Sequence, residues 1–315
     1  MAVHTHLFFT PITVLETGDD GLISIYLQQF IAGLNPTLLF ILYQLIILLQ
    51  AIRINLFLDQ YRMYPQAGYT AALAYVLLTA IIKEWSAISS ALIANFLLIW
   101  MLMKVARLYN QQFPKTVLFN LGFIMGLSII GYHPIAIMVL VLLFSLGIMR
   151  AFQLQEWFVL LMGILLPFYF LIAWLYVYDV PQTFLHYLPK FYFNNNLFPI
   201  HKKLLITGSL TFLVAVITGL FSWQQFNSRL VIQMRKNWSV LVLTLFIVMV
   251  SPFIFRYAGT TTFLMAAVPA STFVGAAFSY PKRLILPNLL FWILVAVIVL
   301  NNLELIVSNS SISAT

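Results

Sequence analysis

Three of the eight acidic residues of this 315-residue chain lie within five positions, as Glu16, Asp19 and Asp20, just before an apolar, helix-like stretch. A carboxylate held beside a membrane could act as general base toward a sugar hydroxyl, or bind a divalent cation on a phosphate. The alternative is a solvated acidic turn in which Asp19 or Asp20 caps the following helix. Asp19 and Asp20 are therefore the candidate catalytic residues, and a divalent cation is the one cofactor that this hypothesis would need.

A second set of residues could bind phosphate. Arg256 follows Pro252 near the end of an apolar segment, and its planar guanidinium suits a phosphate or pyrophosphate, although it could simply reach lipid headgroups. Lys202 and Lys203 close a long aromatic loop, where they could bind an anion or mark the start of a helix. His133 lies in a Gly-Tyr-His-Pro turn and could move a proton or contact a phosphate, or serve as a hydrogen-bonded turn residue.

The composition shows which elements must position these residues. Hydrophobic residues make up 63% of the chain and charged residues 8%, whereas a soluble domain is about half apolar and a quarter charged. The chain has no cysteine, which excludes disulfides, thiol catalysis and Cys-ligated metals, and no metal site is predicted. The net charge of +8 is attributed to Lys and Arg retained on the cytoplasmic face, not to nucleic-acid binding. The sequence therefore predicts an all-α, polytopic transmembrane helical bundle in contact with the lipid bilayer.

The bundle is predicted to have about ten spans over residues 36–303. The ten apolar segments are 36–57, 68–82, 86–103, 116–132, 134–149, 157–178, 204–222, 238–255, 262–279 and 287–303. Residues 1–35 are predicted as an acidic extracytoplasmic lead-in with an interfacial amphipathic helix, and 304–315 as a polar C-terminal tail. Segments 68–103 and 116–149 contain short pairs, which predict either tight hairpins or re-entrant pairs packed in protein.

Polar and small residues within the segments predict contacts between helices. Four polar residues lie within the segments and are interpreted as interhelical hydrogen-bonding residues and not as a transport path: Gln44, Gln50, Asn95 and Asn120. Gly122 and Gly126 form a Gly-x-x-x-Gly pattern, which indicates close helix packing or association with another helix. Alternating loops place eleven Lys and Arg on one side and five on the other, so the eleven-charge side is predicted to be cytoplasmic and both termini extracytoplasmic. On that side the only acids are Asp59 and Glu156.

Four stretches carry a resemblance to a known family: "ILLQAIRINLFLDQYRMYPQAGYTAALAYVLL", "ALIANFLLIWMLMKVARLYNQ", "LFNLGFIMGLSIIGYHP" and "QEWFVLLMGILLPFYFL". They resemble an uncharacterised bacterial family of polytopic inner-membrane proteins, which implies the bacterial inner (cytoplasmic) membrane. Some members of that family are labelled beta-carotene monooxygenase. The residues argue against that activity, because such oxygenases resemble soluble propellers with a four-histidine iron site and the five histidines here are scattered over loops.

The resemblance also implies another hydrophobic segment upstream of the first residue. An acidic first outer loop, an interfacial helix and a multi-span bundle are together similar to membrane glycosyltransferases that use polyprenyl-phosphate sugars. That layout predicts a glycosyltransferase-like enzyme acting on lipid-linked sugars at the outer face, with a polyprenyl-phosphate lipid as partner. The alternatives are a transporter or flippase for such a lipid and a non-catalytic scaffold of an envelope complex. The absence of Asp or Glu at the centre of any span argues against an ion-coupled transporter.

Overall fold

The structure is a computed structural model that describes residues 21–31, 34–191, 202–227, 230–255, 259–281 and 284–312. Only the backbone is described at 28, 31, 83, 181, 186, 202–204 and 302–312. Its elements are α-helices (α) and 3₁₀ helices (η). In chain order they are α2 Leu22–Ile31, α3 Pro36–Gln60, α4 Thr70–Ile81, η2 Lys83–Ser86, α5 Ser90–Arg107, η3 Leu108–Asn110, α6 Pro114–Gly131, η4 His133–Ile137, α7 Met138–Met149, α8 Leu154–Val177, η5 Pro181–Tyr187, α9 Lys202–Asn227, α10 Ile232–Ile254, η6 Thr260–Ala266, α11 Ala267–Ser279 and α12 Ile285–Ile312.

Each of the ten predicted apolar segments forms a helix, which confirms the all-α fold for the described residues. Within the part of the chain that the structure describes, seven helices are long and apolar enough to cross a membrane: Pro36–Gln60, Ser90–Asn110, Pro114–Gly131, Leu154–Val177, Leu205–Asn227, Ile232–Ile254 and Thr260–Ser279. The other three apolar helices, Thr70–Ile81, His133–Met149 and Ile285–Asn301, are shorter. The 12 residues of α4 rise only about 18 Å, against a hydrocarbon core of about 30 Å. The predicted count of about ten spans is therefore not confirmed.

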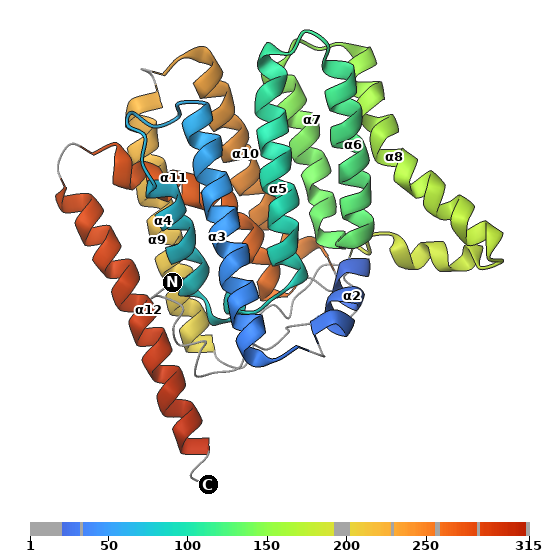
Figure 1. The fold of residues 1–315 in the computed structure, drawn as a ribbon. Coiled ribbons are helices and arrows are strands. Elements are labelled where there is room, and N and C mark those ends of the chain that lie inside the picture. The colour runs from blue at the N-terminus through green and yellow to red at the C-terminus, as the bar shows by residue number, and fades with distance from the viewer. Residues whose placement is uncertain are drawn as a thin grey trace.

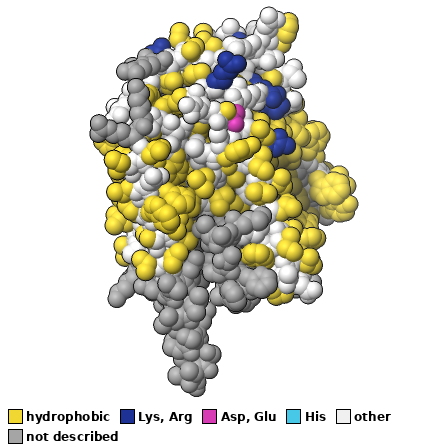
Figure 2. All heavy atoms as spheres, turned by 60° about the vertical axis from the view of Figure 1, so that its left-hand side comes forward, with side chains coloured by type: hydrophobic (Ala, Val, Ile, Leu, Met, Phe, Trp, Pro, Cys, Tyr) yellow, Lys and Arg dark blue, Asp and Glu magenta, His cyan; other side chains and the backbone are white. Residues whose placement is uncertain are grey.

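Helices α3 to α12 run alternately in opposite directions, so that their connections gather at two ends of the bundle (Figure 1). One end, which we call the basic end, carries the described residues Arg62, Lys104, Arg107, Lys115, Arg150, Arg235 and Lys236. Figure 2 shows Lys and Arg side chains near the top of the visible face, above a broad apolar surface. The opposite end, where α2 lies, we call the α2 end. That the basic end faces the cytoplasm stays a prediction.

Helix α11 forms the centre of the bundle. With its η6 lead-in it is the most buried of the seven long apolar helices, and α8 is the least buried. Small residues let the neighbouring helices approach it closely. A side chain at Gly219 of α9 would meet the backbone of Phe273 in α11, and one at Gly275 of α11 would come within 2.9 Å of the Ala71 Cα in α4. The core therefore depends on backbone-to-backbone packing as well as on large apolar side chains.

The Gly-x-x-x-Gly pattern of α6 is used within the chain. Gly122 and Gly126 face α8, where a side chain at Gly122 would come within 3.0 Å of the Gly163 Cα and one at Gly126 within 2.9 Å of Pro167. Close packing of this face is confirmed. The other hypothesis, that these glycines associate with a helix from outside this chain, needs correction, because α8 of the same chain already covers them.

Helix α2 packs on the bundle beside α6 and α5. Ser24 is buried and its hydroxyl donates to the Gly21 carbonyl over 2.7 Å, while Tyr26 and Phe30 are exposed. A face with exposed aromatic rings at the end of an apolar bundle suits the membrane interface, and an interfacial location of α2 stays a prediction. At the other terminus, α12 continues as helix to Ile312, so the predicted tail 304–315 begins in helical form. Both α2 and the last turn of α12 lie at the α2 end (Figure 1).

One buried ion pair lies at the basic end. The Arg150 Nε donates to both carboxylate oxygens of Glu156, over 3.1 and 3.0 Å, and its Nη1 donates to the carbonyls of Leu108 and Gln111 over 3.2 and 2.9 Å. Arg150 therefore ties the α5–α6 connection to the α7–α8 connection. Its guanidinium also binds the carbonyl of Gln111, which caps η3, and is a second donor to the Leu108 carbonyl, which already accepts from the Gln111 N–H.

Candidate functional site at the α2 end

The α2 end is built around three 3₁₀ segments, of which η4 leads into α7 and η6 into α11. The Tyr132 hydroxyl, just before η4, lies 2.9 Å from the Thr262 hydroxyl in η6. The Trp85 indole N–H in η2 donates to the Thr260 carbonyl in η6 over 3.1 Å. Non-α backbone at membrane depth needs partners within the protein, because hydrocarbon supplies none. These two contacts join η2, η4 and η6 into one layer.

An apolar cavity of about 290 Å³ lies beside this layer, between η2, η6, α9 and α10. Its walls are mainly apolar side chains: Leu205, Phe212, Leu213, Met249, Phe253 and Phe263. Ser209 also lines the cavity, but its hydroxyl donates to the Leu205 carbonyl over 2.7 Å. Leu213 and Phe253 are exposed at the surface as well, so the cavity opens on the side of the bundle. Its lining suits a hydrocarbon chain, and its volume is near the lower end of the range for ligand pockets, about 300–1,000 Å³.

A buried polar network closes the middle of the bundle. The Gln50 Nε2 in α3 donates to the Leu92 carbonyl over 2.6 Å, and the Tyr75 hydroxyl in α4 donates to the Gln50 Oε1 over 2.6 Å. The Asn95 Nδ2 in α5 contacts both the Tyr75 hydroxyl and the Leu264 carbonyl at 3.2 Å. The interpretation as interhelical hydrogen-bonding residues is confirmed for Gln50 and Asn95. It is not confirmed for Gln44, whose buried Nε2 has no hydrogen-bond partner among the described residues, or for Asn120, which is exposed. The Gln50, Tyr75 and Asn95 side chains are fully buried, so the network lies in the interior of the bundle, between the basic end and the α2 end.

His133 is 5% exposed and begins η4. Next to it, the Ser251 hydroxyl of α10 donates to the Pro134 carbonyl over 3.2 Å. Gly21, with φ of 127°, packs against the Gly131 carbonyl so closely that any side chain there would collide. The structure thus brings the start of α2 to the turn that contains His133. The candidate residues Asp19 and Asp20 precede Gly21 in the chain but lie outside the described residues, so their roles stay predictions.

Arg256 also lies outside the described residues, and Lys202 and Lys203 are described only by their backbone, as the start of α9. Their described chain neighbours lie at the α2 end. Leu205 lines the cavity. Phe255 forms an isolated antiparallel bridge with Phe191, and the two rings lie 5.3 Å apart. The bridge holds Phe191, within the long aromatic loop, against the residue that ends α10.

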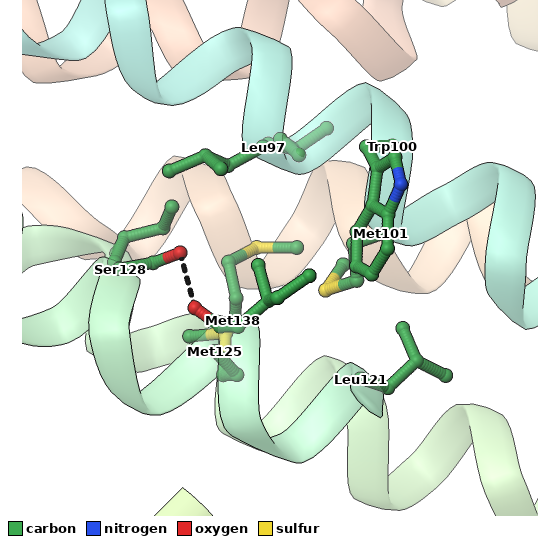
Figure 3. Close-up of a pocket in the computed structure, with 10 residues that line it drawn as sticks. Leu97, Trp100, Met101, Leu121, Met125, Ser128 and Met138 are labelled. Carbon is green, nitrogen blue, oxygen red and sulfur yellow. Dashed lines mark hydrogen bonds between the residues drawn. The ribbon is translucent and has the colours of Figure 1, made fainter. Parts of the chain in front are cut away.

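A smaller hollow lies between α5, α6 and the start of α7, and it is too small for a ligand. Figure 3 shows Met101, Met125 and Met138 among its walls, and its free volume of about 10 Å³ is about that of one water molecule. The Ser128 hydroxyl beside it donates to the Ile124 carbonyl over 2.6 Å. This region is therefore a helix seam filled by flexible methionines.

The described residues hold no group of three or more His, Asp or Glu side chains that could bind a metal ion. Sequence reasoning missed Trp85, which lies in the short connection 83–85 between the apolar segments 68–82 and 86–103. A signal was present, because a tryptophan in a three-residue connection between apolar helices has a large ring to bury. It also assigned no role to Asp59 and Glu156. The signal was that no other acidic residue is predicted on the side with eleven Lys and Arg. Glu156 forms the buried ion pair, and Asp59 lines a separate cavity.

Comparison with known proteins leaves the site to be interpreted from its own geometry. No family model, no curated protein and no solved structure matches the chain. The resemblance to uncharacterised bacterial inner-membrane proteins therefore stays a prediction. For the described residues, the structure establishes a helical bundle with seven helices long and apolar enough to cross a membrane and an apolar cavity at its α2 end.

Proposed function

We propose that the protein is an integral membrane protein that binds a lipid-linked phosphate at the α2 end. The apolar cavity between α9, α10, η2 and η6 is the observation that carries this proposal. A prenyl or acyl chain could enter from the side, past Leu213 and Phe253, without leaving the apolar environment. Apart from Ser209, Thr260 and the Trp85 indole, the lining offers only hydrocarbon and methionine sulfur, which favours a chain over a polar solute.

The phosphate would lie at the rim of the cavity. Helix α9 begins there with Lys202 and Lys203, and Arg256 directly follows Phe255 in the chain. Cationic side chains and the free N–H groups of a helix N-terminus both attract phosphate. This arrangement of an apolar cavity with basic residues near it in the sequence supports a polyprenyl-phosphate type of ligand.

The activity that suits such a ligand is sugar transfer at the same face by a glycosyltransferase-like enzyme. In this scheme Asp19 or Asp20 removes a proton from the acceptor hydroxyl as it attacks the sugar C1, and the lipid phosphate departs with the electrons of the broken C1–O bond. The contact of Gly21 with the Gly131 carbonyl supports a place for this acid pair near the His133 turn. The buried Gln50–Tyr75–Asn95 network weighs against a preformed transport path through the bundle centre.

The proposal is tested by measuring ligand binding when the cavity is open and when a larger side chain fills it. Protein in nanodiscs is titrated with a radiolabelled short-chain polyprenyl phosphate and with the matching polyprenol. We expect the phosphate to bind at least about tenfold tighter than the alcohol, since charge-assisted hydrogen bonds contribute about 1.5–3 kcal/mol. Ser209→Phe, which puts a ring into the cavity, should weaken the binding of both ligands.

Leu210→Phe is the matched control, because Leu210 is the next residue of α9 and is exposed away from the cavity. It should bind both ligands like the wild type. Wild-type affinity in Ser209→Phe, or equal affinity for the phosphate and the alcohol, would contradict the proposal.

A further inference from the structure

A second and larger cavity, of about 640 Å³, lies at the basic end and has no part in the function proposed above. It lies between the end of α3, the loop that follows it, the α9–α10 connection and the end of α11. Its volume is well within the range of about 300–1,000 Å³ that ligand pockets occupy. One wall is apolar and is formed by Phe226, Leu230, Val231 and Met234.

The floor of this cavity is held rigidly by two tyrosines. The Tyr64 hydroxyl donates to the Thr272 carbonyl over 2.5 Å, and the Tyr280 hydroxyl donates to the Met63 carbonyl over 2.7 Å. Burial raises the pKa of Tyr280 to about 12, so it stays a neutral donor at physiological pH. The Phe226 ring stacks on Tyr280 at 4.7 Å. Both hydroxyl groups are thus donated to the backbone, and among the described residues of the lining the charged side chains are Asp59 and Arg62.

Arg62 has a backbone conformation that normally selects glycine. Its φ is 48°, and it follows α3 as the left-handed residue of a Schellman motif, in which the Met63 N–H donates to the Leu58 carbonyl and the Arg62 N–H to the Asp59 carbonyl, each over 3.0 Å. A side chain at this position is disfavoured relative to glycine. An arginine here is therefore explained better by what its side chain binds than by the turn that it forms.

Asp59 and Arg62 line the same cavity without pairing with each other. Both residues are described, and no ion pair joins them. The Asp59 Oδ2 accepts a hydrogen bond from the Asn55 Nδ2 over 2.8 Å, which fixes the carboxylate and leaves it capacity for further donors. Through its described residues the cavity thus offers one anionic group, one cationic group and an apolar wall to a single occupant.

We propose that this cavity binds a zwitterionic aminophospholipid of the leaflet at the basic end. The guanidinium of Arg62 would bind the phosphate, the carboxylate of Asp59 would accept hydrogen bonds from the primary ammonium, and the acyl chains would follow the apolar wall. Val231 is exposed beside the cavity and continues this wall toward the bundle surface, as a lipid occupant requires. A free zwitterion would use the two charges but would leave the apolar wall in contact with water.

The test compares lipids by native mass spectrometry of the purified full-length chain in detergent. We expect phosphatidylethanolamine to bind at least about tenfold tighter than phosphatidylcholine, whose ammonium has no N–H, or phosphatidylglycerol, which has no cation. Arg62→Gly should lose this binding without any fall in melting temperature, because glycine suits the backbone at this position. Asp59→Asn should lose the preference for phosphatidylethanolamine over phosphatidylglycerol.

Arg53→Gln is the matched control, since Arg53 is an exposed arginine of the same helix outside the cavity, and it should bind like the wild type. Equal binding of the three lipids, or wild-type binding by Arg62→Gly, would overturn the proposal. Competition by glycerophosphoethanolamine as strong as that by the intact lipid would also overturn it, because the site would then belong to a soluble zwitterion.

Discussion

Replacing Glu156 by leucine should destabilise the fold more than any surface substitution at the basic end. The Glu156 side chain is 2% exposed and that of Arg150 is 19% exposed, so the variant leaves a largely buried guanidinium without its countercharge. Removing one partner of a fully buried pair costs about 3–5 kcal/mol. Water reaches about a fifth of Arg150, and its two bonds to loop carbonyls remain, so we expect about 2–3 kcal/mol for Glu156→Leu.

The reciprocal change should cost more. Arg150→Met leaves the nearly inaccessible Glu156 carboxylate unpaired and also removes the donors to the Leu108 and Gln111 carbonyls. We expect about 3–5 kcal/mol for this variant. The double variant removes both charges together, so its cost should be clearly below the sum of the two single costs.

The assay is reversible denaturant unfolding in mixed micelles, followed by tryptophan fluorescence. Gln155→Ala is the control, since the Gln155 side chain accepts from the exposed Lys115 Nζ over 2.9 Å, between the starts of α6 and α8 at the same end of the bundle. This exposed contact should be worth no more than about 0.5 kcal/mol. Two results would refute the reasoning: wild-type stability for Glu156→Leu, or strictly additive costs in the double variant.

Three further predictions concern α6 and the α2 end. Gly122→Leu should separate α6 from α8 and lower the free energy of unfolding by about 1–3 kcal/mol by overpacking. The control Asn120→Leu, at an exposed neighbouring position, should not lower it. Similar stability in the two variants would show that the glycine contact is dispensable. If the enzyme proposal holds, either Asp19→Asn or Asp20→Asn should abolish complementation of a strain that lacks the protein, and full function in both would remove the general-base role. Arg256→Lys should bind polyprenyl phosphate about tenfold more weakly than the wild type at equal membrane abundance, because lysine cannot form paired hydrogen bonds; indistinguishable affinity would favour simple contact with headgroups.

Helix positions could be predicted from the sequence because they follow from local composition. An apolar stretch such as 157–178 must form helix in hydrocarbon, where the backbone has no other partner, and α8 forms there as Leu154–Val177. The Gly-x-x-x-Gly face of α6 was also predictable, since Gly122 and Gly126 recur on one side of a helix. Whether its partner is α8 or another chain depends on tertiary packing, which a spacing within one helix does not specify.

The cavities could not be predicted, because their walls come from residues far apart in the chain. Trp85 and Thr260, which meet at the α2 end, are 175 positions apart. The left-handed conformation of Arg62 was also invisible, since an arginine gives no signal for a positive φ where a glycine would. The acid pair Asp19 and Asp20 was found from composition, and its chemistry stays a prediction.

The central position of α11 has a consequence for biosynthesis. Asn95 and its partner carbonyl on Leu264 are 169 residues apart, so at about 5–20 residues per second the ribosome needs roughly 8–35 s to supply the second after the first. During that interval α3, α4 and α5 are in the membrane without the helix that they surround. The polar side chains of these helices already have hydrogen-bond partners at that stage, because Gln50, Tyr75 and Asn95 can bind one another. The network would thus stabilise an intermediate of α3, α4 and α5 during synthesis. The Leu264 carbonyl would join the network once η6 and α11 have been made.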